Sequence, residues 1–334
     1  MTEYVLGIES TAHTFSASVV SSDGKILSNP KSVYVPPEGS GIHPFEASLN
    51  HQRAAPAIVA RALSEAGLGP CELSAVSYAM GPGLGPCLRV GAVVARTLAS
   101  SASKPLVPVN HAVGHIEVGC LLTGATDPLV LLVSGGHTMV ISFSAGRWRV
   151  LGETLDLTLG QLLDQFGRHA GLSSPCGAAI ERAASGSSRY LQLPYTVKGN
   201  DVSFSGMLTA AERLYDSGEP FPDVCFSLQE TAFAMTVEVV ERALAFTGKR
   251  EAMIVGGVAA NRRLSAMMKS MASRHSAELK VVPLEYSGDC GAQIAWTGLL
   301  AFKSGVTVPV SESVVKQSWR LDSVDIPWRA DCEA

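Results

Sequence analysis

The segment PLVLLVSGGHTMVISFSAGRWRVLGET, residues 128–154, decides the fold class because it repeats the plan of an earlier segment. It predicts an apolar strand, a Ser134-Gly135-Gly136 turn, a second strand, an Ala145-Gly146 turn and a third strand. The earlier segment YVLGIESTAHTFSASVVSSDGKILS, residues 4–28, predicts an apolar strand, a small polar turn, an alternating strand and an Asp23-Gly24 turn. Both small turns offer backbone N–H groups with little side-chain bulk, which suits contact with a phosphate.

A third glycine site lies in AMIVGGVAANRRL, residues 252–264. Gly256 and Gly257 end a predicted strand, and Asn261 opens a helical segment, so a nucleoside can lie against the backbone here. Each glycine pair alone is most often only a turn. The order of the three sites resembles the duplicated plan of actin, sugar kinases and heat-shock chaperone ATPases. That resemblance implies an α/β fold with two lobes and a nucleotide cleft between them. Residues 1–128 and about 289–334 are expected to form the first lobe, and residues 129–288 the second.

Composition and charge indicate a globular enzyme. The chain has 334 residues, of which 46% are hydrophobic and 17% charged, and the longest apolar runs are far shorter than the roughly 20 residues of a membrane span. No basic leader precedes an apolar segment, so we expect a cytoplasmic protein without a membrane partner. The seven cysteines are scattered without a CxxC pair, which predicts reduced thiols. A net charge of −4 predicts weak binding of nucleic acid by this chain alone.

The segment PVNHAVGHIEVG, residues 108–119, places His111 and His115 four positions apart on one face of a predicted helix. This spacing is typical of the first two ligands in zinc proteases. Such a protease needs a glutamate directly after the first histidine to activate water, but Ala112 stands there. Glu117 lies on another face of the helix and does not replace that base. The pair therefore favours a metal site without proteolytic chemistry.

Strings spread over nearly the whole chain resemble one family, the threonylcarbamoyltransferases that modify tRNA. Two strings, STAHTF and QSWRLDSVDIPW, resemble the archaeal members, which share the KEOPS complex branch with the eukaryotic ones. The resemblance implies transfer of the threonylcarbamoyl group from threonylcarbamoyl-AMP to N6 of adenosine 37, immediately 3′ of the anticodon, in tRNAs that read codons beginning with A. The matching strings include GIESTAHTFSASVV, GIHPFEASLNH, GPGLGPCLRVG, PVNHAVGHIEVG, LVSGGHTMV, GETLDLTLGQLLDQFGRHAGL, SFSGMLTA, GGVAANRRL and GDCGAQIAW.

The resemblance also implies the site residues. One divalent ion, Fe²⁺ or Zn²⁺, is expected on His111, His115 and Asp289, a ligand set that leaves coordination positions open. Asp164 and Glu181 are expected to accept hydrogen bonds from ribose hydroxyls of ATP or threonylcarbamoyl-AMP. The complete predicted nucleotide-binding set is Leu132, Val133, Ser134, Gly135, Gly136, Asp164, Gly177, Glu181 and Asn261.

The acids among these residues also have ordinary structural roles open to them. Asp289 precedes a Gly-Ala helix start, where aspartate is a common N-cap. Asp164 and Glu181 can be helix-surface acids. Glu9, beside the first turn, is a candidate contact to a phosphate or to a water on the metal, or simply a strand-end acid. The sequence has no Ser-His-Asp constellation, so no covalent nucleophile is predicted.

Four positions depart from the family pattern. Leu132 stands where archaeal members commonly carry a tyrosine that can reach the metal, and Phe45 stands where a basic residue is common. Cys176 replaces a glycine of a PGG string, and Cys290 replaces a common asparagine after the metal aspartate. We expect these changes to alter affinity and metal preference rather than the class of reaction.

The resemblance implies several partners besides tRNA. They are a KEOPS-type protein kinase subunit, separate or fused at the C-terminus, a small bridging subunit, and an enzyme that supplies threonylcarbamoyl-AMP. Two other functions remain open from the sequence. A small-molecule kinase of the same superfamily explains the duplicated turns but gives no use to the histidine pair. An ATP-controlled scaffold, in which the nucleotide locks the lobes for partner docking, also fits.

Overall fold

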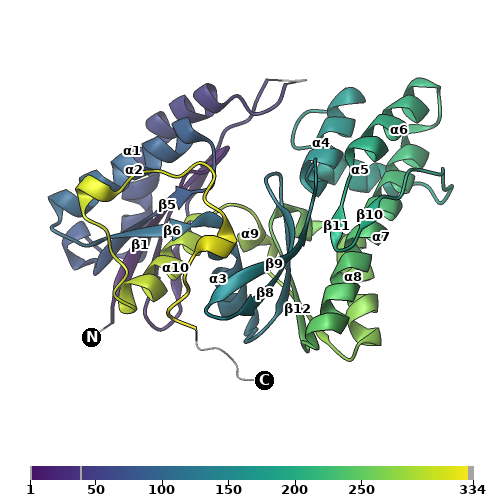
Figure 1. Cartoon of the computed structure of the whole chain (residues 1–334). Coiled ribbons are helices and arrows are strands. Elements are labelled where there is room, and N and C mark those ends of the chain that lie inside the picture. Colours follow the sequence, from purple (N-terminus) through teal and green to yellow (C-terminus); the bar gives the residue numbers. More distant parts are fainter. Residues whose placement is uncertain (1, 38–39, 330–334) are drawn as a thin grey trace.

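The computed structural model describes residues 2–37 and 40–329 (Figure 1). Cys332 and the last five positions of the predicted segment 289–334 lie outside the described residues. The six cysteines within them form no disulfide. Within these two ranges, every helix is too short or too polar to cross a membrane.

The first sheet contains the first predicted hairpin. Strands β1 and β2 pair antiparallel, and β1, β5 and β6 run parallel, in the spatial order β3-β2-β1-β5-β6 with β4 also on β2. The turn at Asp23-Gly24 separates β2 from β3, as predicted. The strands are β1 (Tyr4–Glu9), β2 (Thr14–Ser21), β3 (Ile26–Ser28), β4 (Lys31–Val33), β5 (Ala75–Gly81) and β6 (Leu106–Asn110).

The second sheet repeats this topology. Strands β7, β8 and β9 form an antiparallel meander, and β7, β12 and β13 run parallel, in the order β9-β8-β7-β12-β13. The predicted duplication is therefore confirmed in strand order and in strand direction. The strands are β7 (Leu129–Val133), β8 (Thr138–Ser144), β9 (Arg147–Glu153), β12 (Glu251–Val255) and β13 (Glu278–Val281), and a separate pair is formed by β10 (Val197–Lys198) and β11 (Asp201–Val202).

Helices cover both sheets (Figure 1). In the first half of the molecule α1 contacts β2 and α2 contacts β5, while α10 contacts β1, β2, β5 and β6. The helices are α1 (Pro44–Ala66), α2 (Gly85–Ser101), α3 (His111–Thr123), α4 (Leu159–His169), α5 (Gly177–Ala184), α6 (Ser205–Asp216), α7 (Phe221–Thr247), α8 (Arg262–Arg274), α9 (Leu284–Ser287) and α10 (Gly291–Lys303). The 3₁₀ turns are Pro70–Glu72, Gly257–Ala260, Val310–Glu312 and Leu321–Ser323.

Strand β2 is more deeply buried than an alternating sequence usually indicates. Its sequence alternates polar and apolar residues, yet all eight positions are buried. The reason is that α1 and α10 both pack on this strand, so neither face meets water. Its serines are hydrogen-bonded inside the fold, for example Ser16 Oγ to Pro30 O at 2.8 Å.

Helix α3 lies between the two sheets. It is buried continuously from His111 to Cys120, and it contacts β5 and β6 of the first sheet, β7 and β12 of the second, and α10. An all-round apolar helix requires such enclosure on every side. Because α3 touches both sheets, these contacts do not fix a boundary near residue 128, and the lobe division stays a prediction.

Glycine at position 7 allows α10 to lie directly against β1. A Cβ placed on Gly7 would come within 2.1 Å of the Ala295 backbone nitrogen, so no side chain fits there without displacing the helix. Gly298 meets the sheet in the same way, because its Cβ would lie 2.3 Å from Ser77 Cβ. This close packing sets the position of the segment that immediately precedes α10.

We expect Gly7→Ala to lower the free energy of unfolding by about 1–3 kcal/mol, the usual cost of forcing an extra carbon into a packed interior. Gly206→Ala is the matched control, because its Cβ would meet no atom within 4 Å and the residue lies in α6. There the gain in helix propensity should raise stability by up to about 1 kcal/mol. Urea unfolding of both variants measures the difference, and equal stabilities would contradict the close packing.

Candidate functional site

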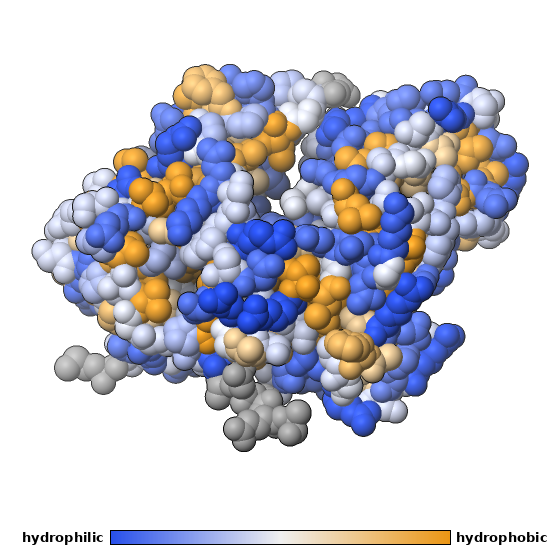
Figure 2. Space-filling model, in the orientation of Figure 1, coloured by the Kyte–Doolittle hydropathy of each residue, from blue (hydrophilic) through white to orange (hydrophobic). Residues whose placement is uncertain are grey.

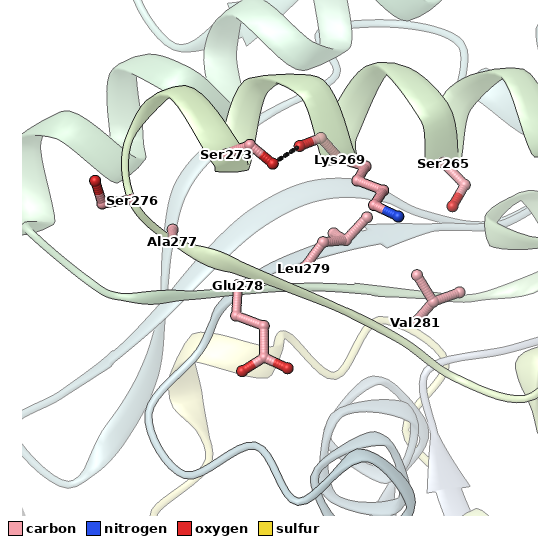
Figure 3. Close-up of a pocket in the computed structure, with 8 residues that line it drawn as sticks. All are labelled: Ser265, Lys269, Ser273, Ser276, Ala277, Glu278, Leu279 and Val281. Atoms are coloured by element: carbon pink, nitrogen blue, oxygen red, sulfur yellow. Dashed lines mark hydrogen bonds between the residues drawn. The ribbon is translucent and has the colours of Figure 1, made fainter.

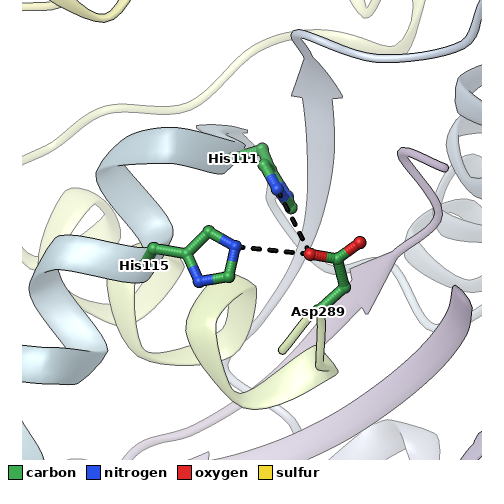
Figure 4. Close-up of side chains that lie close together, drawn as sticks. All are labelled: His111, His115 and Asp289. Carbon is green, nitrogen blue, oxygen red and sulfur yellow. Dashed lines mark ion pairs between the residues drawn. The ribbon is translucent and has the colours of Figure 1, made fainter. Parts of the chain in front are cut away.

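The predicted metal ligands meet at one point. His111 and His115 lie one turn apart on α3, and Asp289 stands in the loop that precedes α10 (Figure 4). Asp289 Oδ1 lies 3.5 Å from His111 Nε2 and 3.3 Å from His115 Nε2. One ligand atom from each of the three residues lies within 4.8 Å of the other two.

This donor set fits a divalent cation. His115 Nε2 is buried and makes no well-formed hydrogen bond among the described residues, although Asp289 Oδ1 lies 3.3 Å away. A buried polar nitrogen without a partner is costly, and a bound cation would satisfy it. Two imidazole nitrogens and one carboxylate oxygen suit Zn²⁺ or Fe²⁺. Asp289 is not the helix N-cap, because Cys290 occupies that position of α10.

Glu9, Gln293 and Thr11 each place a side-chain atom within 3.3 Å of His111 Nδ1. Glu9 is wholly buried, and its Oε2 lies 2.8 Å from His111 Nδ1, while its Oε1 accepts from the Thr11 amide at 2.6 Å. Gln293 Nε2 donates to Glu9 Oε2 at 3.3 Å and lies 3.0 Å from His111 Nδ1. A carboxylate on Nδ1 fixes the ring so that Nε2 is free to bind metal.

The contact between Glu9 and His111 depends on tertiary structure. Glu9 ends β1, whereas His111 follows β6, and β5 lies between these two parallel strands in the sheet. The predicted contact of Glu9 with a phosphate or with a water on the metal stays a prediction. Sequence reasoning missed Gln293 altogether, although it lies in the string GDCGAQIAW.

The buried acids control the protonation of the histidines. Burial by itself would lower the pKa of His111, but Glu9 and Asp289 outweigh it and raise that pKa to about 9. Burial lowers the pKa of His115. Burial also opposes the charge on Asp289, yet His111 and His115 bring the pKa of Asp289 well below its ordinary range. Without metal, His111 is therefore a positively charged imidazolium at neutral pH, whereas His115 is a neutral imidazole.

The second hairpin turn lies beside this centre. The ring of His137 stacks on His111 with 6.1 Å between ring centroids. Burial, with the charge of His111, lowers the pKa of His137 to about 3, so this ring is neutral at pH 7. The predicted site stops one position short of His137. The available signal was a histidine directly after a glycine turn, in a position to face the same cleft.

Some of the backbone amides in the turn at residues 134–137 already donate hydrogen bonds within the turn. Ser134 Oγ accepts from the amides of Gly136 and His137 at 3.2 and 3.0 Å, and the Ser134 amide donates to His137 O at 2.8 Å. Leu132 and Val133 are fully buried in β7. A Cβ on Gly135 or Gly136 would meet no atom within 4 Å, so open space adjoins the turn.

The first hairpin turn is packed more tightly than expected. The Thr11 amide already donates to Glu9, and Thr11 O accepts from the Leu84 amide at 2.8 Å. Ser10 is fully buried, and Gly91 of α2 packs against its hydroxyl. The expectation that this turn offers free amides to a phosphate is therefore wrong for Thr11.

The remaining predicted residues form two groups in the second half of the molecule. Asp164 pairs with Arg168 and accepts from Ser174 Oγ at 2.7 Å and from the Cys176 amide at 3.1 Å, just before Gly177 opens α5.

Glu181 lies on α5 and accepts from the amide of Arg262, the residue next to Asn261, at 2.8 Å. Asn261 caps α8 by accepting from Arg263 and Leu264, and it donates to Gln229 Oε1 at 2.6 Å. Nucleotide binding by these residues stays a prediction.

Both groups are connected to the second turn. Thr158, the N-cap of α4, donates from Oγ1 to Gly135 O at 3.0 Å. Gly256 approaches the end of β7 so closely that a Cβ there would lie 2.3 Å from Val133 O, and its φ of +94° favours glycine. The second hairpin turn and the third glycine site are therefore neighbours.

The space-filling view shows a notch between the two halves of the molecule (Figure 2). A separate surface hollow of about 620 Å³ lies between α8 and β13 (Figure 3). It is lined by Ser265, Lys269 and Ser273 from the helix and by Glu278, Leu279 and Val281 from the strand. None of the predicted site residues borders this hollow, so it takes no part in the candidate site.

Comparison with known proteins identifies the family. The model of the tRNA N6-adenosine threonylcarbamoyltransferase family (TsaD) matches residues 25–296. The chain belongs to this family. The tRNA N6-adenosine threonylcarbamoyltransferase of Caldivirga maquilingensis is 53% identical over 324 residues, which cover 97% of this chain and 98% of the relative. That of Methanopyrus kandleri is 52% identical over 334 residues, covering 97% and 96%.

Solved structures confirm the predicted duplicated fold of the actin-like ATPases. HypF of T. kodakarensis superposes with a TM-score of 0.64 at 13% identity, over 91% of this chain and 48% of that one. The activator of 2-hydroxyisocaproyl-CoA dehydratase from Clostridium difficile, solved with bound ADPNP, gives 0.55 at 12% identity, over 91% and 97%. At such low identity these likenesses show the fold alone.

The pKa of His111 predicts that metal binding is coupled to proton release. A histidine must be neutral to bind a metal ion, so His111 has to lose its proton wherever the pH lies below about 9. At pH 7 we expect about one proton released per Zn²⁺ ion bound, and an affinity that rises about tenfold per pH unit up to that value.

Calorimetric titration in buffers of different ionisation enthalpy counts the protons. Glu9→Gln removes a charge that raises the His111 pKa, so this variant should release fewer protons at pH 7. Proton-free metal binding by the unaltered protein at pH 7 would contradict the assigned charge state.

Proposed function

We propose that this chain transfers the threonylcarbamoyl group from threonylcarbamoyl-AMP to N6 of adenosine 37, in tRNAs that read codons beginning with A, with the help of a metal ion. Membership in the family makes the chain an acyltransferase that acts in tRNA modification. The single observation that carries the metal-assisted mechanism is the cluster of His111, His115 and Asp289 in a chain of this family.

The reaction asks the protein mainly for positioning and electrostatics. The adenosine N6 attacks the carbonyl carbon of the mixed anhydride, a carbon–nitrogen bond forms, and the bond from that carbon to the phosphate oxygen breaks. AMP leaves with the electron pair, and N6 loses a proton. Because AMP is a good leaving group, holding both substrates in register supplies much of the rate enhancement.

His111, His115 and Asp289 would hold the ion, which supplies Lewis-acid stabilisation of charge on the donor's oxygens. Glu9 keeps His111 turned toward it by accepting from Nδ1, and Gln293 in turn donates to Glu9. Glu117 cannot act as a hydrolytic base, since Arg329 and Trp148 already occupy its oxygens. This supports acyl transfer over proteolysis.

The second turn and its neighbours are the proposed nucleotide contacts. The open space beside Gly135 and Gly136 admits a phosphate, while Leu132 and Val133 fix the turn from within β7. Asp164 and Glu181 would turn toward ribose hydroxyls, each exchanging a present protein contact for the ligand. Gly177 and Asn261 would border the sugar and base. ATP and threonylcarbamoyl-AMP share the groups recognised here.

Partners complete the proposal. The net charge of −4 supports help with tRNA from a KEOPS-type kinase subunit, separate or fused, and a small bridging subunit. A further enzyme must supply threonylcarbamoyl-AMP, made from threonine, bicarbonate and ATP. We place this activity in the cytoplasm, where tRNA is available.

His115→Ala should lower Zn²⁺ or Fe²⁺ affinity more than about 100-fold and abolish tRNA modification in a reconstituted system, because a direct ligand is lost. His275→Ala is the control, since this histidine contacts Glu241 on a distant surface. Metal content by mass spectrometry and modified adenosine by nucleoside analysis report the two effects. Full activity in a metal-free His115→Ala protein would refute the metal-assisted mechanism.

We expect the isolated chain to bind tRNA with a Kd weaker than about 1 µM at physiological salt, in the range of non-specific contacts. Adding the kinase and bridging subunits should tighten binding, since they contribute the missing cationic surface. Filter binding at several salt concentrations measures both states. Tight binding by the isolated chain with little salt dependence would contradict this division of roles.

A further inference from the structure

The last described residues, 313–329, form a strap that crosses from the first sheet to the second (Figure 1, yellow). At its start the strap is held by the first sheet. The Lys316 amide donates to Met80 O at 2.8 Å, and Gln317 O accepts from the Gly83 amide at 3.1 Å. Arg96 of α2 donates to Ser313 Oγ at 2.7 Å. The strap therefore begins with fixed contacts beside β5.

The strap next reaches the start of α3. Asn110 is the N-cap of this helix, and its Oδ1 accepts from the amides of Ala112 and Val113 at 3.0 and 3.2 Å. The Nδ2 of the same side chain donates to Trp319 O at 3.1 Å. A side-chain amide has one donor end and one acceptor end, so the Trp319 carbonyl keeps the acceptor end facing the helix.

Beyond this point the strap packs against the second sheet. Leu321 and Ile326 are buried in the apolar cluster that also contains Val113, Ile116 and Trp148. The Ile326 amide donates to Gly146 O at 2.9 Å, in the turn between β8 and β9. Both sheets thus hold the strap, and α3 lies beneath it.

The strap ends on the second turn of α3. Arg329 donates from Nε to Glu117 Oε1 at 2.9 Å and from Nη2 to Oε2 at 3.0 Å, in the two-pronged geometry that fixes both groups. Its Nη1 donates to Thr126 O at 3.1 Å, and its guanidinium lies 4.8 Å from the centroid of the Trp148 ring. Trp148 Nε1 also donates to Glu117 Oε1, at 3.1 Å.

This ion pair is enclosed. The Glu117 side chain is 3% exposed and that of Arg329 is 15% exposed. Water therefore cannot replace Arg329 as a partner of the glutamate without opening the apolar cluster, and an unpaired buried carboxylate is strongly unfavourable. The end of the strap and α3 consequently hold each other in one relative position.

Both metal-binding histidines lie between the two points where the strap holds α3. Asn110 precedes His111 directly, and Glu117 follows His115 by two residues on a different side of the helix. The side of α3 that carries the two histidines faces Asp289, whereas the strap contacts the helix at Asn110 and Glu117. A small rotation of α3 would carry both Nε2 atoms away from Asp289 together.

We propose that residues 313–329 are a positioning strap for the metal centre, with Trp319 O on Asn110 and Arg329 on Glu117 setting the position of α3. Arg329 and Asn110 are positioning residues, since neither touches the ligand atoms. The proposal rests on the proposed metal-assisted function and adds to it a conformational control of ligand geometry by a distant segment.

Arg329→Met removes the charge but keeps an unbranched chain over Trp148. This variant leaves Glu117 unpaired and can lose stability for that reason alone. The double variant Glu117→Gln/Arg329→Met removes the unpaired charge and should recover most of the stability. Asn110→Ser retains a good helix N-cap acceptor but lacks the amide donor for Trp319 O. Asp325→Asn is the control, because its pair with Arg147 is exposed.

Zn²⁺ affinity is measured by competition with a chromophoric chelator, alongside the melting temperature and amide hydrogen exchange of α3 in metal-free protein. We expect the double variant and Asn110→Ser to bind Zn²⁺ about 10- to 100-fold more weakly, the range for loss of groups that orient ligands. Exchange in α3 should quicken in both, with melting temperatures near that of the unaltered protein. Asp325→Asn should change none of these values.

Two results would contradict the proposal that residues 313–329 position α3. One is unchanged Zn²⁺ affinity and α3 exchange in both variants, and the other is a loss of affinity that merely follows the loss of melting temperature. Failure of the unaltered protein to bind Zn²⁺ or Fe²⁺ would instead refute the metal-assisted function, and α3 exchange in the metal-free variants would still decide the strap. The two proposals therefore fail by different observations.

Discussion

The direct contact between α10 and β1 is the constraint on which the site depends. Gly7 has no side chain, and the Ala295 backbone occupies the place where a Cβ would stand. Helix α10 therefore lies at one fixed depth on the first sheet, and Asp289, just before it, arrives at the start of α3. Gly114 of α3 faces Gln293 of α10 at 3.4 Å from its Cβ position, so the two helices also approach closely. The predicted metal ligands come from distant segments, and they lie close together because Gly7 and Gly114 allow α10 to approach β1 and α3.

Charge balance explains why this buried position suits a divalent ion. Glu9 and Asp289 bring two carboxylates into the centre, and a proton on His111 compensates only one of them. Replacing that proton by a doubly charged ion would bring the local charge to zero, with both histidines neutral. In a poorly solvated interior an uncompensated charge is expensive, so the exchange is favoured electrostatically. The Glu9 carboxylate thus orients His111, and its negative charge also favours binding of a cation.

Local sequence patterns predicted the parts of the fold that are themselves local. The turns at Asp23-Gly24, Ser134-Gly136 and Ala145-Gly146 separate strands as expected, and the spacing of His111 and His115 placed both on one helix face. Asp289 joined them only through family resemblance, because nothing local to it indicates a metal. The role of Glu9 behind His111 depends on which strands are neighbours in the sheet. The burial of β2 likewise depends on two helices that its own sequence does not specify.

The duplicated hairpins have diverged into different tasks, and the difference begins at equivalent positions. Glu9 ends the first strand of one copy, and Val133 ends the first strand of the other. In the first copy the acid takes the Thr11 amide and the His111 ring, while α2 packs over the turn. In the second copy the valine side chain cannot accept hydrogen bonds. The Gly136 amide instead donates to Ser134 Oγ, and open space lies beside Gly135 and Gly136. One acid therefore commits the first turn to holding His111, a proposed metal ligand, and leaves the second turn open for the proposed phosphate contact. A single duplicated element would then account for both halves of the proposed acyl-adenylate site.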